Sequence, residues 1–198
     1  MKAFFVGCVL LSTLGAAIMS GEAVAMENLK GKRIVMIIAH ENFRDEELNA
    51  PLAIFQNAGA EVIIASSELA VAKGKFGALI MPDILYSDID PKKYDAVVFV
   101  GGPGAVQYLD DSQAHRIARE TLSAGRVLAA ICIAPAILAK AGVLKGKSAT
   151  VFPSDQNALI DGGARYTAKG VEVDGSIVTA DGPQSAAPFA NEIVKLLK

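Results

Sequence analysis

The sequence contains no tryptophan and few other aromatic side chains, which together make up 6% of its 198 residues. A core built from this composition must be mainly aliphatic. Two cysteines are too few for a small fold held together by several disulfides. Neither sign of charge is in excess, because 19 basic residues oppose 21 acidic residues and leave a formal net charge of −2. Without a basic excess, the sequence predicts no nucleic-acid partner.

Apolar residues are abundant instead. Hydrophobic residues make up 52% of the chain and charged residues 20%, which excludes intrinsic disorder. The length is that of a chain with one domain and a short appendage.

An apolar segment opens the chain. Lys2 precedes an uncharged stretch, Ala3–Met19, and Ala23–Ala25 then supplies an Ala-Val-Ala cleavage site. This layout predicts a secretory signal peptide over residues 1–25 and a single domain over residues 26–198. A membrane anchor is the alternative, because the stretch approaches a spanning length, although small polar residues dilute it. Cleavage near Ala25 would place the protein in the periplasm or outside the cell, without stable membrane association.

Six short apolar runs follow, rich in β-branched residues and without polar alternation. Such runs are typical of parallel strands buried on both faces. Amphipathic stretches between them predict helices. The sequence therefore predicts a doubly wound, flavodoxin-like α/β fold, with a mostly parallel sheet, helices on both faces and function at the carboxyl ends of the strands. The predicted strands are Arg33–Ala39, Glu61–Ala65, Asp95–Val100, Val127–Ile131, Ala149–Phe152 and Ile177–Ala180.

Three amphipathic helices and one hairpin complete the prediction. Asp110 or Asp111 is placed to cap the second helix. Residues 69–80, split at Lys73–Lys75, predict a hairpin on the edge of the sheet. The residues predicted to face the core are Leu48, Leu52 and Phe55 in the first helix, Ile117, Ala118, Thr121 and Leu122 in the second, and Phe189, Ile193 and Leu197 in the last.

Cys132 is the first candidate for chemistry. Loss of Cys8 with the signal would leave it as the only cysteine, either buried and inert or used as a nucleophile. It follows the strand Val127–Ile131, and Pro135 suits the first turn of a helix. This pattern predicts a nucleophile elbow, where the helix N-terminus would lower the pKa of the thiol. A buried structural cysteine is the alternative.

Glu47 is the second candidate. Asp45 and Glu46 also open the first helix, where acids complement the helix dipole. Glu47 differs because it precedes inward-facing Leu48, and Pro51 removes the i+4 partner of its carbonyl, which predicts a distorted first turn. A carboxyl in that apolar corner would have a raised pKa, and when protonated it could donate a hydrogen bond to a thiolate.

A glycine-rich turn after the third strand is the third candidate. The segment Gly101-Gly102-Pro103-Gly104 matches neither a dinucleotide fingerprint nor a phosphate loop, so the sequence predicts no cofactor. Its amides, with that of Ile133, suit an oxyanion hole, and an ordinary tight turn is the alternative. Gly101 and Pro103 are assigned to the substrate rim. No cluster has metal-ligand spacing, so no metal is expected.

The two histidines have weaker claims. His40 follows the first strand and is a candidate for the substrate rim, although a histidine without a catalytic role is an equal alternative. His115 falls on the polar face of its predicted helix, and we expect it to be solvated.

Taken in order, these segments resemble the ThiJ/PfpI superfamily, which has the class I glutamine amidotransferase-like fold. The resemblance covers residues 32–197. It implies that Cys132 is the elbow nucleophile, Glu47 its acidic partner, and Gly102 and Ile133 the anion-binding amides. It also implies a homodimer or larger homo-oligomer. The matching segments are Phe43–Leu48, Val100–Gly104, Ala130–Pro135, Gly142–Gly146 and Thr179–Pro183.

Three differences between this sequence and members of the superfamily make some of their activities less favoured. The peptidase-like members carry His directly after the elbow cysteine, where this chain has Ile133, so a cysteine peptidase is less favoured. Glutamine amidotransferases use a late His-x-Glu, and no histidine follows His115. DNA-binding regulators append a further module, for which this chain has no room.

Two hypotheses of different class remain for this small-molecule site. The first is a cofactor-independent enzyme that acts on reactive carbonyls, like a glyoxalase or deglycase, through Cys132 and Glu47. The second is a non-enzymatic sensor of oxidative stress, or a holdase chaperone, that uses the same thiol.

The predicted export can be checked by mass. We expect protein recovered from the periplasmic fraction to begin at Met26, because the site at Ala23–Ala25 follows an uncharged run. Intact-mass spectrometry measures this directly. A full-length species retained in the membrane would contradict it.

Overall fold

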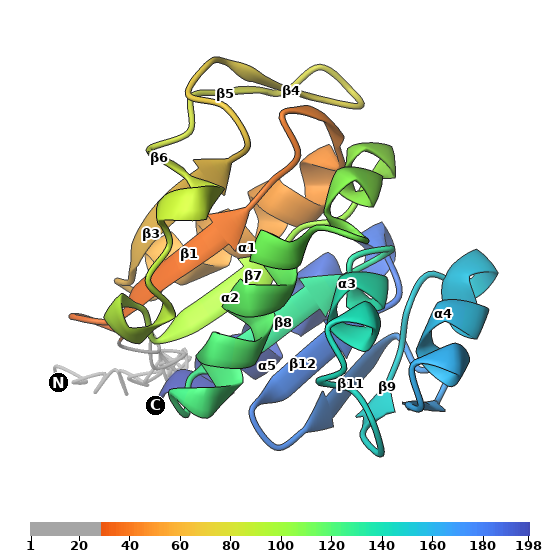
Figure 1. Ribbon diagram of the computed structural model, residues 1–198. Helices are drawn as coiled ribbons and strands as arrows, with labels where there is room; N and C mark the ends of the chain where they lie inside the picture. The colour runs from red at the N-terminus through yellow and green to blue at the C-terminus, as the bar shows by residue number, and fades with distance from the viewer. Residues whose placement is uncertain (1–28) are drawn as a thin grey trace, which may run out of the picture.

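The computed structural model describes residues 29–198, and the predicted signal peptide lies outside this range. A seven-stranded sheet with the order β11-β12-β8-β7-β1-β3-β6 forms its centre (Figure 1). Every neighbouring pair is parallel except β11 with β12. The predicted mostly parallel sheet is therefore confirmed. Its strands are β1 (Arg33–Ile37), β3 (Glu61–Ser66), β6 (Ile84–Leu85), β7 (Ala96–Phe99), β8 (Val127–Ile131), β11 (Val171–Asp174) and β12 (Ile177–Ala180).

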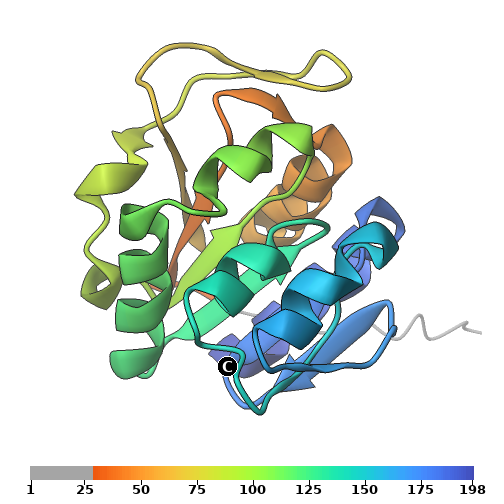
Figure 2. The same ribbon diagram turned by 45° about the vertical axis from the view of Figure 1, so that its right-hand side comes forward.

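Helices cover both faces of this sheet, as predicted (Figures 1 and 2). The helices α1 and α5 pack together on one face, and α2 and α3 lie on the other, with α4 against α3. Their bounds are Asp45–Asn57 for α1, Ser112–Ser123 for α2, Pro135–Lys140 for α3, Gln156–Asp161 for α4 and Ala186–Leu197 for α5. Short 3-10 turns lie at Tyr86–Asp88, Pro91–Lys93, Pro103–Tyr108, Pro153–Asp155 and Pro183–Ser185.

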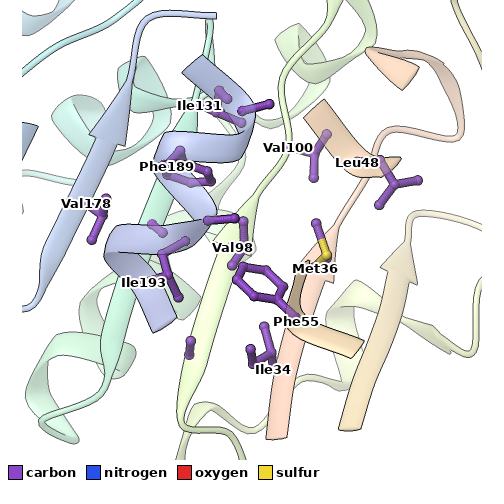
Figure 3. Packing of buried hydrophobic residues seen from close by; sticks show 14 of the residues in the cluster. Ile34, Met36, Leu48, Phe55, Val98, Val100, Ile131, Val178, Phe189 and Ile193 are labelled. Carbon is purple, nitrogen blue, oxygen red and sulfur yellow. The ribbon is translucent and has the colours of Figure 1, made fainter. Parts of the chain in front are cut away.

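The core divides because side chains alternate along each strand. Ile34 and Met36 of β1 join the cluster under α1 and α5, together with Phe55 and Phe189 (Figure 3). Val35 and Ile37 belong instead to the cluster under α2 and α3. A strand that is apolar at every position therefore buries one of its faces in the first cluster and the opposite face in the second. None of the helices within residues 29–198 has both the length and the apolar character needed to cross a membrane.

One predicted strand is wrong. The run Ala149–Phe152 contributes only the end of β9 (Ser148–Ala149), which pairs with β10 (Arg165–Tyr166) outside the central sheet. Beyond β9 the backbone leaves any strand ladder, because the amide of Thr150 donates to Thr179 Oγ1 and that of Phe152 donates to the carbonyl of Cys132. The two edge strands β6 and β11 carry weak apolar patterns and were not predicted.

The helix α1 is continuous through Pro51, so the predicted distortion of its first turn is not observed. A proline at this place removes one hydrogen bond, at a cost of about 3 kcal/mol. Burial of Leu48, Pro51 and Phe55 on one face of the helix offsets that cost.

The predicted hairpin is present, but it does not extend the central sheet. Its strands β4 (Ala72–Gly74) and β5 (Leu79–Ile80) form a separate three-stranded sheet with β2 (Glu41–Phe43). In Figure 1 this small sheet lies beyond the ends of β1 and β3. The hairpin turn is tied to α1, because Asp45 accepts hydrogen bonds from the amides of Phe76 (2.9 Å) and Ala78 (2.8 Å).

Asp45 is the buried group that connects the hairpin to α1, and its replacement tests that connection. Burial opposes ionisation of Asp45, but the amides of Phe76 and Ala78 together outweigh it and hold its pKa below the ordinary value. We expect Asp45→Asn to lower the free energy of unfolding by about 1–3 kcal/mol, because one amide loses its acceptor. Urea denaturation at neutral pH measures the difference.

The stability difference between wild type and Asp45→Asn should decrease as the pH falls. A carboxyl with a lowered pKa stabilises the fold above its unfolded pKa and loses that contribution as the pH falls, so the gap between wild type and variant should close below about pH 4. Glu46→Gln, at the exposed neighbouring position, should stay within about 1 kcal/mol of wild type. Equal losses in the two variants would show that the tie to the hairpin contributes nothing specific.

Candidate active site

Cys132 lies on a strained turn between β8 and α3, as predicted. Its φ of 64° is in the left-handed region, although it is not glycine. Such a conformation costs on the order of 1–3 kcal/mol and persists only where the surroundings enforce it. Here the amide of Cys132 donates to the carbonyl of Ala180 on β12 (2.9 Å), and Pro135 begins α3.

The glycine turn after β7 brings a carboxyl against this thiol. A Cβ atom on Gly101 would lie 2.6 Å from Glu47 Oε2 and 2.7 Å from Cys132 Cβ. Gly102 has a φ of 101°, and a Cβ there would collide with the backbone of Asn42 to Arg44. Only glycines at both positions let the start of α1 approach the elbow this closely.

Glu47 is completely buried at this contact. Burial raises the pKa of its carboxyl to about 7, although the nearby Cys132 thiol, Arg44 guanidinium and Gly101 amide act in the opposite direction. Neither carboxyl oxygen has a hydrogen-bond partner of ordinary geometry among residues 29–198. The sequence-based expectation of a raised pKa is therefore confirmed.

The expectation for the thiol is wrong. Burial, together with the adjacent Glu47 carboxylate, raises the pKa of Cys132 to about 12. The backbone amides of Gly102 and Ile133 act in the opposite direction, as a helix N-terminus should, but they are outweighed. The sequence revealed the elbow and its amides, whereas it could not reveal how deeply the sulfur would be buried beside a second acid.

The two groups titrate as a pair. At neutral pH the pair of Glu47 and Cys132 holds between one and two protons, and above the pKa of Glu47 it holds a single proton. The amides of Gly102 and Ile133 lie beside the sulfur, where they can stabilise a negative charge on a bound oxygen.

A cavity of about 500 Å³ opens onto this pair. Of the residues predicted for the site, Glu47, Gly102, Pro103, Cys132 and Ile133 line it, and Gly101 lies beneath the carboxyl and the thiol. The sequence did not predict the other lining residues, which are Arg44, Lys75, Phe152, Ser154, Asp155, Pro183 and Gln184.

Comparisons with known proteins match this architecture. The family model described as the DJ-1/PfpI family matches residues 32–196. The chain belongs to the DJ-1/PfpI family.

The similar proteins include one named as a deglycase and one named as a glyoxalase. Deglycase PfpI of Pyrococcus furiosus is 34% identical over 83% of this chain and 99% of its own length. The glutathione-independent glyoxalase DJR-1.2 of Caenorhabditis elegans is 25% identical over 84% of this chain and 89% of its own length. The crystal structure of a ThiJ/PfpI domain protein from Brachyspira murdochii has a TM-score of 0.81 and 34% identity, and covers 85% of this chain and 97% of its own.

Neither histidine of this DJ-1/PfpI protein reaches the cavity. His40 lines a separate hollow with Glu41 and Glu68, whose carboxyl oxygens lie 3.9 and 3.8 Å from its Nε2. His40 is thus not among the residues that line the cavity at Cys132, although Pro103 lines both hollows, and its assignment to the substrate rim stays a prediction. His115 is half-buried rather than solvated, and its Nε2 lies 2.8 Å from the carbonyl of Leu109.

Most of the lining residues that the sequence did not predict lie on loops far from Glu47 and Cys132 along the chain. Lys75 comes from the hairpin turn, Phe152 to Asp155 follow β9, and Gln184 follows β12. Arg44 and Pro183 are the two that lie within segments marked by the family resemblance, which assigned neither of them a role. Polar loop residues carry no periodic pattern, so no signal in one sequence identifies them.

The coupling of the pair predicts how alkylation of Cys132 should respond to Glu47. Because the Glu47 carboxylate raises the pKa of the thiol, Glu47→Gln should lower that pKa and speed the reaction with iodoacetamide at pH 9. The gain is about tenfold for each unit by which the thiol pKa falls. Rates measured from pH 6 to 10 on wild type and variant give the comparison.

Glu46→Gln is the matched control, since it removes the same charge at an exposed position one residue away. It should leave the alkylation profile close to that of wild type. If Glu47→Gln reacts more slowly than wild type at every pH, Glu47 instead stabilises the thiolate by donating a proton, as the sequence alone had suggested.

Proposed function

We propose that this DJ-1/PfpI protein converts small reactive aldehydes, such as 2-oxoaldehydes, without a cofactor. One observation carries the proposal: a buried carboxyl lies against a buried thiol beside two backbone amides. The relatives named as a deglycase and a glyoxalase support the same class of substrate. The relevant chemistry is a movement of protons at a carbonyl carbon, which this pair suits.

The reaction begins with attack of Cys132 on the aldehyde. The sulfur bonds to the aldehyde carbon, the thiol proton passes to the Glu47 carboxylate, and the oxygen gains the negative charge. The amides of Gly102 and Ile133 stabilise that oxygen. Return of the proton from Glu47 to the oxygen completes a hemithioacetal and leaves Glu47 ionised for the next step.

Rearrangement and hydrolysis then release the product. Glu47 removes the hydrogen of the former aldehyde carbon as a proton and returns it to the neighbouring carbonyl carbon. The proton of the hemithioacetal hydroxyl moves to the oxygen of that neighbouring carbon, which yields a thioester of a 2-hydroxy acid. Water cleaves the thioester and restores the thiol. The net reaction adds one water, and the oxidation of one carbon balances the reduction of its neighbour, so no external oxidant or reductant is needed.

A peptidase is less well supported by the cavity. No histidine lines it within residues 29–198, so the departing amine would lack an imidazole acid. We further propose, from the sequence, that the protein works outside the cytoplasm after loss of residues 1–25, and as a homo-oligomer.

Turnover of methylglyoxal tests the enzyme directly. We expect wild type to form lactate, Cys132→Ser to form none, and Glu47→Gln to lose about a hundredfold or more, the usual loss for a missing general base. The value of kcat/KM should rise as the pH increases through about 7, because Glu47 must be ionised to accept the proton. Lactate formation measured between pH 5 and 9 provides all three results.

The variants also separate the enzyme from the redox sensor. Lactate formation that persists in Cys132→Ser would rule out the proposed nucleophile. If wild type forms no lactate while Cys132 is the residue oxidised by peroxide, the sensor hypothesis replaces the enzyme.

A further inference from the structure

Charged side chains line the cavity that holds Cys132. Its lining includes two cations, Arg44 and Lys75, and two acids, Glu47 and Asp155. Glu47 is buried against the thiol, and Asp155 Oδ2 accepts a hydrogen bond of 2.8 Å from Ser154 Oγ. The proposed mechanism uses neither cation.

Hydrogen bonds fix the backbone of the hairpin turn at Lys75. Its amide donates to the carbonyl of Phe43 (2.9 Å), and the following amides of Phe76 and Ala78 donate to Asp45. Gly74 is required there, because a Cβ atom would lie 2.6 Å from the Asp45 carboxyl oxygens. The buried carboxylate of Asp45 thus fixes the turn that brings Lys75 to the cavity.

Arg44 and Lys75 both contact the Phe76 ring, but only Arg44 is paired with a carboxylate. The Arg44 guanidinium carbon lies 4.6 Å from the centre of the Phe76 ring, and Lys75 Nζ lies 5.7 Å from it. Arg44 also donates to both oxygens of Glu46, at 2.8 and 3.2 Å. Among the ion pairs of residues 29–198, Arg44 is paired with Glu46, whereas Lys75 is in none and contacts the Phe76 ring instead. Lys75 therefore presents at the cavity a positive charge that is not paired with a carboxylate.

We propose that Lys75 is a specificity-determining residue that selects aldehydes carrying an anionic group, with Asp45 as its positioning residue. The inference rests on the proposed function and names its substrate class. The aldehyde carbon meets Cys132, the anionic group pairs with Lys75, and the apolar side chains of Pro103, Phe152 and Pro183 line the cavity that holds the rest of the molecule.

A matched pair of substrates isolates the charge. The probes are 4,5-dioxopentanoate, a 2-oxoaldehyde with a carboxylate, and its uncharged methyl ester. We expect wild type to favour the acid in kcat/KM, mainly through a lower KM. In Lys75→Gln the ratio of acid to ester should fall about fivefold, the size expected for one partly exposed ion pair. The preference should also weaken at high salt.

Lys73→Gln is the control, because it removes the same charge from the same hairpin at a residue that does not line the cavity. Its ratio should match that of wild type. Asp45→Asn should lower the ratio in the same direction as Lys75→Gln, since the turn is no longer held. A purely structural role for Asp45 would lower both rates together and leave the ratio unchanged.

The failures of the two proposals are distinguishable. If methylglyoxal is converted but Lys75→Gln and Lys73→Gln keep the wild-type ratio, the role of Lys75 is overturned and the enzyme stands. If wild type converts no aldehyde, the proposed function falls, and calorimetric titration with 4-oxopentanoate, an unreactive keto acid, decides the role of Lys75. Binding that is weakened in Lys75→Gln but not in Lys73→Gln supports the anion site, and equal or absent binding overturns it.

Discussion

The contact between the Glu47 carboxyl and the Cys132 thiol is the constraint on which the site depends. It requires the start of α1 to touch the end of β8, and a side chain at Gly101 would occupy that space. It also requires the left-handed turn at Cys132, which hydrogen bonding to β12 maintains. Burial of both groups raises both pKa values, so Glu47 is partly protonated near neutral pH, where an exposed carboxyl would be ionised.

Two acids of one helical turn show how local partners decide the role of a carboxyl. Asp45 and Glu47 are both buried at the start of α1. Asp45 meets two backbone amides and has a lowered pKa, so it serves as a fixed anion that holds the hairpin. Glu47 meets no hydrogen-bond donor of ordinary geometry within residues 29–198 and has a raised pKa, so it is suited to exchange protons. A single short segment thus supplies both an architectural anchor and a candidate acid–base group.

The hairpin connects these two roles in space. By holding the turn from Lys75 to Ala78, Asp45 brings a cation from a separate small sheet to the cavity that Glu47 lines. The central sheet therefore positions the reacting pair, whereas the appended sheet shapes what can approach it. This division suits a fold in which loops at the carboxyl ends of the strands determine specificity.

Much of this architecture was determined by the sequence itself. Unbroken apolar runs can only be buried on both faces, so the parallel strands, their two cores and the elbow after Val127–Ile131 followed from local pattern. The raised pKa of Glu47 followed from its place beside Leu48. Short edge strands and the segment after β9 did not, because side-chain and loop partners decide their hydrogen bonding. Tertiary structure alone decided that burial beside Glu47 would raise the pKa of Cys132, that His40 would lie in another hollow, and that Lys75 would reach the cavity. These outcomes depend on groups that lie far apart in the chain, and the energy of a charge depends on everything that surrounds it.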